Sequence, residues 1–552
     1  MKRNPAFTRR QFCATVVGSA FVGQERLAPA SDRPNVCIFL TDQLRSDALG
    51  CYGNPLVRTP NLDRIAAEGA RFDNAYCTTP LCSPARASIW SGVYPHRHGV
   101  VDLWGRIPSF RGPVPGWPAP DFRELPWLGH LFSNAGYETV YAGKWHCLTG
   151  AQRPGFQRAL ARYGDFDIDS PEQNEYIAYA LSKGYPIGDI RGHGNDFVAA
   201  GEGYGTSIYS EQDHRDTFIV RRACEYLRQS HSRPFLLVVS VLSPHNPYAP
   251  PKPYDTMYSP ADVKLPPNVD VHTVQRRPIP VRAHPAERKW AQDASKFELQ
   301  AAWAHYLGMV THVDRLVGEL IDTLESQGLR ENTMILFTSD HGDALGSHRV
   351  ENKGAFMYDT VTRIPLILHM PGRIKPRVVP QAVSQVSILR TLCDYAAIHD
   401  STPRDGASWK PLLDGRGGLA NTPVFCEYNR FYGEHLPVRA IVTEQLKYVE
   451  YFGPEGELFD RQADPYEMTN LLHAPDYAGR LAEIRGRLRR HMVQGRDPCA
   501  RLWQVPAAAS KEAGESHLGP ARHGELVGGA SCLAETVGHE VDYGQVLLGC
   551  RR

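Results

Sequence analysis

Cys82 lies in a stretch whose residue types suit nucleophilic chemistry. It opens residues 82–92, in which Pro84 suits the first residue of a helix and Gly92 suits its end. We therefore expect Cys82 just before a short helix, beside unpaired backbone N–H groups and the positive end of the helix dipole. Arg86, one helical turn away, adds a permanent positive charge, so the thiol is electronically unusual. The alternative interpretation is a small buried cysteine beside a paired arginine.

Four short apolar runs end in polar residues that suit cation or anion binding. The runs, each with the polar residue that follows it, are 36–40 with Asp42, 138–141 with Lys144, 235–239 with His245 and 334–337 with Asp340. Short, nearly continuous apolar runs predict strands of a sheet that is covered on both faces. Ligands of such sheets gather at the carboxyl ends of the strands, where these four polar residues are expected.

Two of these residues, Asp42 and Asp340, carry carboxylates, and His341 adjoins the second. Carboxylates that converge at strand ends repel each other unless a cation lies between them. Oxygen ligands suit Ca²⁺ or Mg²⁺, and the imidazole also admits Mn²⁺. We therefore predict a site for one divalent metal ion. For each aspartate taken alone, a helix cap or a turn is the alternative role.

Helical patterns alternate with these strands. Residues 61–67, 128–132 and 313–324 carry apolar side chains at helical spacing, and a glycine follows each pattern. Alternating strands and helices predict an α/β fold with a largely parallel sheet. Two proline-rich stretches, 108–126 and 247–285, lack a clear period and are expected to be surface loops at the lips of the active site.

The pattern changes in the C-terminal part of the chain. Residues 439–443, 446–452 and 457–459 are typical of short antiparallel strands, and a helix is expected over 481–492. These elements predict a smaller C-terminal α+β subdomain. Beyond them the chain is rich in Gly and Ala without a strong period, and a loosely ordered extension is expected there.

The N-terminus has the features of an export signal. Arg9 and Arg10 precede a short apolar run, and small residues at 28–30 have the spacing of a cleavage site. The arginine pair resembles a twin-arginine signal, which predicts a periplasmic or secreted protein without stable membrane insertion. A disordered basic tail is the alternative. The expected segments are a twin-arginine signal peptide at 1–30, a catalytic domain at 31–400, the α+β subdomain at 401–500 and the extension at 501–552.

The charge balance argues against a nucleic-acid-binding protein. The 552 residues carry 61 basic and 60 acidic side chains, so no basic field directs the chain to nucleic acid or to an anionic membrane. Selectivity for an anionic substrate must then come from local charges. The 12 cysteines lie scattered, without CxxC or His/Cys zinc spacing, so a disulfide scaffold is not expected, although one or two bridges stay open.

The segment Cys82-x-Pro84-x-Arg86, followed by Ser91-Gly92, resembles the signature of the sulfatase family. The resemblance implies that a formylglycine-generating enzyme converts Cys82 to Cα-formylglycine, an aldehyde. A thiolate that attacked a sulfate ester would form a thiosulfate linkage with no easy exit. A hydrated aldehyde offers two hydroxyls on one carbon, so one attacks sulfur and the other, once deprotonated, collapses to the carbonyl and expels sulfate.

Residues 41–43 and 339–343 resemble the metal-binding segments of sulfatases. The ligands implied by this resemblance are Asp42, Gln43, Asp340, His341 and an oxygen of modified Cys82. Ca²⁺ is the expected ion, with Mg²⁺ and Mn²⁺ as alternatives. Many sulfatases have a second aspartate where Gln43 stands, and some have asparagine where His341 stands, so this neutral pair lowers the negative charge of the site.

Residues 143–146 and 243–248 resemble two further sulfatase segments. The implied roles are sulfate binding for Lys144 and Lys353, proton removal from the formylglycine hydrate for His146, protonation of the leaving oxygen for His245, and anchoring of the hydrate for Arg86. Taken singly, each lysine is better interpreted as a solvated surface charge, and each histidine as a hydrogen-bonded structural residue. The matching segments follow one another in the family's order, which makes coincidence improbable.

The resemblance extends over residues 34–492, including a C-terminal segment at 456–471. It implies an alkaline-phosphatase-like α/β/α sandwich with a mixed central sheet, beside a small four-stranded antiparallel sheet. The implied function is release of inorganic sulfate from an organic sulfate ester, of a carbohydrate or an aryl compound. A phosphodiester or phosphonate monoester hydrolase and a catalytically silent binder of sulfated glycans are the alternatives. Trp104 and Tyr248 are candidates for stacking on a sugar, with a packing role as the alternative.

Overall fold

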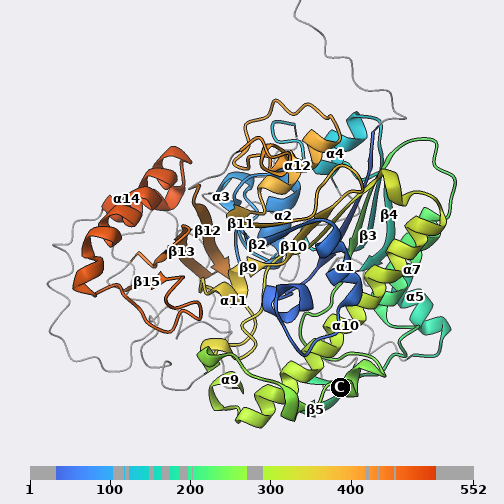
Figure 1. Ribbon diagram of the computed structural model, residues 1–552, viewed down its shortest axis with the longest axis horizontal. Helices are drawn as coiled ribbons and strands as arrows, with labels where there is room; N and C mark the ends of the chain where they lie inside the picture. Colours follow the sequence, from blue (N-terminus) through green and yellow to red (C-terminus); the bar gives the residue numbers. More distant parts are fainter. Residues whose placement is uncertain are drawn as a thin grey trace, which may run out of the picture.

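The computed structural model describes residues 33–103, 117–118, 123–147, 154–163, 174–185, 197–201, 203–269, 290–417, 422–431, 434–452 and 455–504. The predicted signal peptide, Trp104 and residues 505–552 lie outside the described residues. Helices cover both faces of a central sheet, and a smaller sheet with one long helix lies at its side (Figure 1). In the described part of the chain, no helix is both long and apolar enough to cross a bilayer.

The central sheet has nine strands in the order β11-β2-β10-β8-β1-β7-β3-β4, with β9 beside β2. The strands are β1 (Asn35–Thr41), β2 (Ala70–Tyr76), β3 (Glu138–Lys144), β4 (Arg158–Tyr163), β7 (Phe235–Ser240), β8 (Thr333–Ser339), β9 (Arg363–Ile364), β10 (Leu366–His369) and β11 (Arg377–Ser384). The strands from β8 to β4 run parallel, whereas β10 is antiparallel to both β8 and β2. The four strands predicted from apolar runs are confirmed, and the sheet is mixed, as the resemblance implies.

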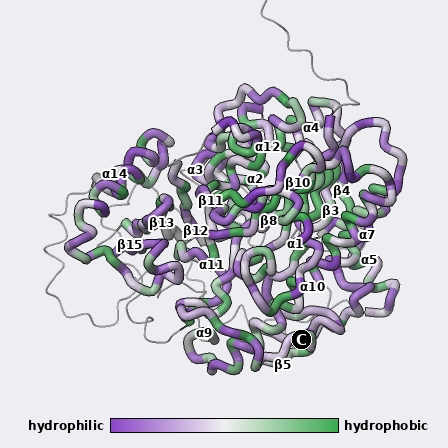
Figure 2. The backbone as a smooth tube through the Cα atoms, in the orientation of Figure 1, coloured by the Kyte–Doolittle hydropathy of each residue, from purple (hydrophilic) through white to green (hydrophobic). Residues whose placement is uncertain are grey.

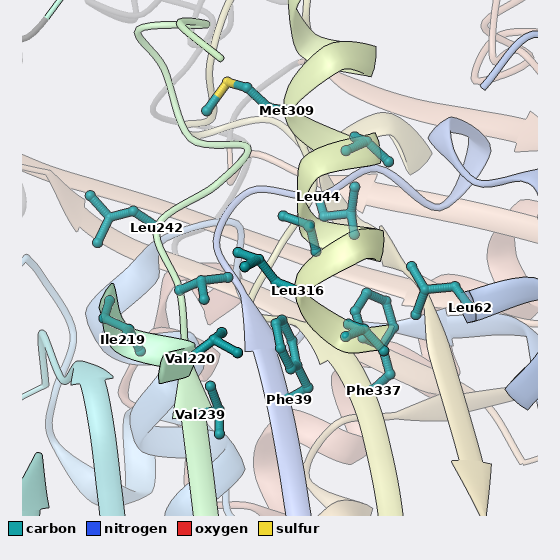
Figure 3. Packing of buried hydrophobic residues seen from close by; sticks show 14 of the residues in the cluster. Phe39, Leu44, Leu62, Ile219, Val220, Val239, Leu242, Met309, Leu316 and Phe337 are labelled. Atoms are coloured by element: carbon teal, nitrogen blue, oxygen red, sulfur yellow. The ribbon is translucent and has the colours of Figure 1, made fainter. Parts of the chain in front are cut away.

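Helices bury both faces of this sheet, which explains why its strands are nearly continuous apolar runs. The helices on one face are α1 (Pro60–Glu68), α7 (Arg215–Leu227) and α10 (Lys296–Ser326), and those on the other are α2 (Cys82–Ser91), α4 (Leu128–Asn134) and α12 (Ser387–Tyr395). Side chains alternate between the two layers, so Phe39 packs in the α10 layer and Ile38 in the α2 layer. In Figure 3, Phe39 and Phe337 of the sheet face Leu316 of α10. Figure 2 shows hydrophobic residues concentrated along the central strands.

The helix boundaries follow local capping signals. α1 has Pro60 at its first position, and α10 begins after Ser295, whose side chain forms a reciprocal capping box with Glu298. α10 contains the predicted pattern 313–324 and extends it toward the N-terminus. The remaining α-helices of the described chain are α3 (Pro95–His98), α5 (Glu175–Ser182), α9 (Trp290–Asp293), α11 (Asp359–Thr362), α13 (Lys410–Leu413) and α14 (Ala478–Gln494).

A second, antiparallel sheet forms the C-terminal part. Its strands, in order, are β12 (Val424–Phe431), β13 (Glu434–Val442), β14 (Leu446–Glu450) and β15 (Gly456–Asp460). Ile484, Leu488 and Met492 of α14 pack on this sheet, which confirms the predicted apolar face of that helix. Three of the four strands were predicted from the sequence; β12 and the hairpin of β5 (Phe197–Gly201) and β6 (Tyr204–Ser207) were not.

The start of helix α2 lies two residues earlier than expected. Helix α2 begins at Cys82, after Leu81 in extended conformation, so Cys82 is the first helical residue and Pro84 is the third. The predicted end is confirmed, because Gly92 adopts a left-handed conformation with φ 67°. Cys82 therefore still lies in the first turn, where the backbone N–H groups of the helix are exposed to a bound anion.

Candidate active site

The predicted site residues meet at the carboxyl edge of the central sheet. β1 and β8 are adjacent and parallel, with Thr41 opposite Ser339, so Asp42 and Asp340 follow the two strands side by side. Lys144 is the last residue of β3, and His245 follows β7. Parallel pairing brings these segments together although they are far apart in the sequence.

Cys82 faces two of the predicted metal ligands. Its Sγ lies 3.2 Å from Nε2 of His341 and 3.8 Å from Oδ1 of Asp42, and its side chain is buried. Burial and Asp42 would raise the pKa of the Cys82 thiol, but Lys353, Lys144 and His341 outweigh them and lower it. The thiol is thus electronically unusual, and Lys353, Lys144 and His341 have the largest lowering effects on its pKa.

Arg86 is fully buried and holds the two aspartates in place. Its Nη2 donates to Oδ2 of Asp42 at 2.8 Å, and its Nε donates to Oδ2 of Asp340 at 2.9 Å. Its Nη1 donates to Oγ of Ser240 and to the carbonyl of Lys144. Because both Oδ2 atoms bind Arg86, the Oδ1 atom of Asp42 is left on the side of Cys82.

The donor atoms of Asp42, Cys82, Asp340 and His341 lie within 4.8 Å of one another, and all four residues are buried. Two carboxylates, an imidazole and the side chain of residue 82 form a donor set that suits a divalent cation. Burial alone would raise the pKa of Asp42, but Lys144, His245 and Arg86 hold it well below the usual range, so this ligand is ionised. The residues therefore fit a divalent metal ion.

Two lysines approach the same pocket from different segments. Nζ of Lys144 donates to Oδ2 of Asp42 at 2.6 Å. Nζ of Lys353 donates to Nε2 of His245 at 2.7 Å and also to Oε1 of Gln43. Burial opposes the charge on Lys353, but Cys82 and Asp42 raise its pKa. Both amino groups therefore lie in the pocket that contains Cys82, as anion binding requires.

The two histidines of the prediction lie in the same electrostatic environment. Nδ1 of His245 donates to the carbonyl of Asn246 at 2.5 Å, so its Nε2 is the acceptor for Lys353 and the ring is neutral. Burial and Lys353 lower the pKa of His245 well below its usual value. Burial and Lys144 do the same for the pKa of His146, two residues beyond β3.

Two residues of the site, Asp343 and Asn352, were not assigned roles from the sequence. Asp343 is fully buried, and its Oδ2 accepts from Nε2 of Gln43 at 2.7 Å and from Oη of Tyr248 at 2.8 Å. Burial raises the pKa of Asp343, while the hydrogen bonds from Gln43 and Tyr248 oppose that rise. Tyr248 is only 4% exposed, so it has the packing role rather than the sugar-stacking role. Asn352 adds a further acceptor at 3.3 Å from Nε2 of Gln43.

Comparison with known protein families shows to which family the chain belongs. The sulfatase family matches residues 34–398, and the family described as the C-terminal part of N-sulphoglucosamine sulphohydrolase matches residues 346–494. The chain belongs to the sulfatase family. This sulfatase is therefore a sulfuric ester hydrolase with the α/β architecture of the alkaline phosphatase superfamily, which confirms the fold and the activity predicted from the sequence.

Individual relatives are similar over most of their length. The sulfatase is 29% identical over 486 residues to an arylsulfatase of Clostridium perfringens, covering 82% of this chain and 93% of the relative. It is 28% identical over 564 residues to an N-acetylglucosamine-6-O-sulfatase of Bacteroides thetaiotaomicron, covering 90% and 92%. Among solved structures, a phosphonate monoester hydrolase of Agrobacterium radiobacter is similar with a TM-score of 0.71 and 25% identity, covering 84% of this chain and 96% of that one.

Proposed function

We propose that this sulfatase acts on a carbohydrate or aryl sulfate ester, with formylglycine formed from Cys82 as the nucleophile. The observation that carries the proposal is the convergence at residue 82, where Sγ lies 3.2 Å from His341 and 3.8 Å from Asp42. Lys144 and Lys353 reach the same pocket. The arylsulfatase and the N-acetylglucosamine-6-O-sulfatase among the relatives support the two substrate classes.

Asp42, Gln43, Asp340 and His341 would hold one divalent ion, with Ca²⁺ expected and Mg²⁺ or Mn²⁺ as alternatives. When bound, that ion supplies Lewis-acid polarisation of the sulfate group. Arg86 keeps both aspartates oriented, because it donates to their Oδ2 atoms. The same guanidinium would stabilise the hydrate of formylglycine beside it.

The proposed reaction has two steps, a displacement at sulfur and an elimination that breaks a C–O bond of residue 82. An ionised hydroxyl of the formylglycine hydrate forms a bond to sulfur while the bond from sulfur to the ester oxygen breaks, which leaves the sulfate on residue 82. Lys144 and Lys353 neutralise the sulfate oxygens, where preorganised charge has its largest effect. His146 then accepts the proton of the second hydroxyl, the carbonyl re-forms as sulfate departs, and water hydrates the aldehyde again.

His245 is proposed to protonate the leaving oxygen. In the substrate-free pocket its Nε2 accepts from Lys353 and the ring is neutral, so it must gain a proton before it can donate one. A bound sulfate ester adds negative charge beside the ring and attracts Nζ of Lys353 to a sulfate oxygen. Both effects raise the pKa of His245 and favour its protonated form in the substrate complex.

Two measurements on the purified protein test this function together. Mass analysis of the peptide that contains Cys82 should find the aldehyde in active protein, and an unmodified thiol in active protein would refute the nucleophile. Assays should detect inorganic sulfate released from a panel of sulfated mono- and oligosaccharides and aryl sulfates. Absence of sulfate release from every ester, with formylglycine and metal present, would instead favour a sulfated-glycan binder.

A phosphonate monoester hydrolase is the second candidate. The similarity to the enzyme of Agrobacterium radiobacter favours it. Rates on 4-nitrophenyl sulfate and on a 4-nitrophenyl phosphonate monoester, measured side by side, separate the two activities. A higher kcat/KM for the phosphonate would make it the principal substrate.

We also propose export by the twin-arginine route, supported by Arg9 and Arg10 before the apolar run. This route carries folded proteins, so a formylglycine-generating enzyme would act on Cys82 inside the cell before export. Fractionation of cells that express the full chain, together with the Arg9→Lys/Arg10→Lys double variant, tests it. Periplasmic or secreted activity that persists in the variant would rule out this route.

A further inference from the structure

Gln43 is fixed in an unusual backbone conformation at the centre of the site. Its φ is 66°, a left-handed value that residues other than glycine rarely adopt. The main-chain N–H of Gln43 donates to Oδ1 of Asp340 at 3.1 Å, and its carbonyl accepts from Oη of Tyr306 at 2.8 Å. Such a conformation persists where the surroundings over-determine it, and it is typical of functional sites.

The side-chain amide of Gln43 lies between two groups of opposite hydrogen-bonding character. Its Nε2 donates to Oδ2 of Asp343 at 2.7 Å, and its Oε1 accepts from Nζ of Lys353. An amide has nearly the same shape after it is turned over, so shape alone does not decide which atom faces the pocket. Both carboxyl oxygens of Asp343 accept hydrogen bonds and the ammonium group of Lys353 only donates them, so one orientation satisfies both partners.

Each carboxyl oxygen of Asp343 accepts a further hydrogen bond. Its Oδ2 also accepts from Oη of Tyr248 at 2.8 Å, and its Oδ1 accepts from the main-chain N–H of Leu345 at 2.9 Å. The ring of Tyr248 packs edge-on against Tyr306, with centroids 5.5 Å apart. Tyr306 is the residue that donates to the carbonyl of Gln43. Tyr306, Tyr248 and Asp343 therefore form one connected group that contacts both the backbone and the side chain of Gln43.

We propose that Asp343, supported by Tyr248, is a positioning residue that turns the amide oxygen of Gln43 toward the metal position. This inference rests on the proposed metal site. A divalent ion of this type binds the carbonyl oxygen of an amide and not its nitrogen, so the orientation decides whether Gln43 is a ligand. A carboxylate at position 43 would meet the carboxylate of Asp343, which explains why an uncharged ligand and a buried aspartate occur together here.

Reversal of the hydrogen-bond polarity provides a direct test. In the Gln43→Glu/Asp343→Asn double variant, the amide introduced at position 343 donates from Nδ2 to the carboxylate introduced at position 43. Oδ1 of the side chain at position 343 still accepts from the main-chain N–H of Leu345, and the net charge of the protein is unchanged. Either single change instead leaves two acceptors or two donors in contact. Full-length protein is freed of metal with a chelator, and its affinity for Ca²⁺ and for Mn²⁺ is measured by titration calorimetry.

We expect each single variant to bind the ion at least about 10-fold more weakly than the unchanged protein, in line with other residues that orient metal ligands. The double variant should return to within about 3-fold, by the same ligand-orientation effect. Gln43→Glu alone brings a negative charge next to the metal ion. If the orientation of the side chain at position 43 did not matter, this variant should therefore bind the ion more tightly. Tighter or unchanged binding by Gln43→Glu, or a double variant no better than the weaker single variant, would overturn the inference.

Asp314→Asn is the matched control. Asp314 is also a buried carboxylate that accepts from a main-chain N–H, that of Leu62 at 2.8 Å, and from a side-chain amide, that of Asn61 at 2.9 Å. It lies in α10, outside the metal donor group. Its variant should bind the ion as the unchanged protein does, and circular dichroism establishes that every variant is folded. If the unchanged protein binds neither ion, the proposed metal site fails, and this inference fails with it.

Discussion

The active site and a second buried cluster of this sulfatase contain similar side chains and have different organisation. The second cluster, here called the C-terminal joint, connects α3 of the main part to the C-terminal sheet. It consists of His96, Glu427, Arg439 and Asp497, all of them buried. The donor atoms of His96, Glu427 and Asp497 lie within 4.8 Å of one another, as close as those of the metal donors in the active site.

In the C-terminal joint, every carboxylate oxygen already has a protein donor. Both oxygens of Asp497 accept from Arg439, at 2.5 and 2.9 Å. Both oxygens of Glu427 accept from His96, at 2.6 Å from its main-chain N–H and 2.7 Å from Nδ1. Nε2 of His96 contacts the carbonyl of Gly495. A metal ion could bind here only if these ion pairs broke. We therefore interpret the C-terminal joint as a structural ion-pair cluster.

In the active site, Arg86 binds only the Oδ2 atoms of Asp42 and Asp340. Oδ1 of Asp42 and Nε2 of His341 remain on the side of Cys82. Oδ1 of Asp340 also has donors, the main-chain N–H groups of Gln43 and His341, so the two clusters differ at Asp42, whose Oδ1 faces the weakly donating thiol of Cys82. The comparison teaches that closeness and residue type alone do not distinguish a candidate metal site from a structural ion-pair cluster, because the donors that already occupy each carboxylate oxygen also count.

The largest expected difference between the two regions concerns their cysteines. Cys82→Ala should lower kcat by about 10⁴-fold or more, because it removes the nucleophile. Cys499→Ala, which truncates an equally buried cysteine beside Asp497, should leave kcat within about 2-fold, since it touches no reacting atom. Sulfate-release assays and thermal unfolding measure both. Turnover by folded Cys82→Ala protein near the unchanged rate would contradict the assignment.

His245→Ala should have an effect that depends on the leaving group. For a sugar sulfate, kcat should fall by roughly 10²–10⁴-fold, because a basic alkoxide needs a proton as it leaves. For 4-nitrophenyl sulfate the loss should be under about 10-fold, since that phenoxide is stable without protonation. Lys353→Ala should slow both substrates alike. Equal losses for both substrates in His245→Ala would assign His245 to sulfate binding instead.

In the C-terminal joint, Asp497→Asn should affect stability and not catalysis. The change leaves the buried guanidinium of Arg439 with an incomplete partner, which is expected to cost about 3 kcal/mol in the free energy of unfolding. Denaturant unfolding measures the loss, and added Ca²⁺ or Mn²⁺ should not restore it. A change in kcat or in metal affinity of more than about 3-fold, beyond the usual scatter for distant sites, would give the joint a functional role.

The pH dependence of the stability that the C-terminal joint contributes should be smaller than the effect of Asp497→Asn. Burial opposes ionisation of Glu427, but His96 and Arg439 lower its pKa from 4.5 to about 2. A carboxyl group with a depressed pKa in the folded state stabilises the protein above pH 4.5 and loses that contribution as the pH falls toward 2. The difference in unfolding free energy between the unchanged protein and Glu427→Gln should therefore shrink by about 2 kcal/mol over this range. A difference that is constant with pH would contradict this.

The central strands were predictable because their signal is local. Burial on both faces makes β1, β3, β7 and β8 apolar runs, and the polar residues just after them mark the carboxyl edge. The antiparallel direction of β10 was implied only by the family resemblance, because strand direction depends on the pairing partner. β12 was missed because Glu427 and Asn429, which are buried in the joint, interrupt its apolar pattern.

The sequence by itself determined the family, the apolar strands and the chemistry-bearing residues, since each is encoded in residue type and short spacing. Only the tertiary structure decided which oxygens of Asp42 face Cys82, and that Asp343 and Tyr248 orient the amide of Gln43. Gln43 and Asp343 are 300 positions apart in the chain. Hydrogen-bond direction between such residues depends on how the strands pair, and no local pattern in the sequence encodes it.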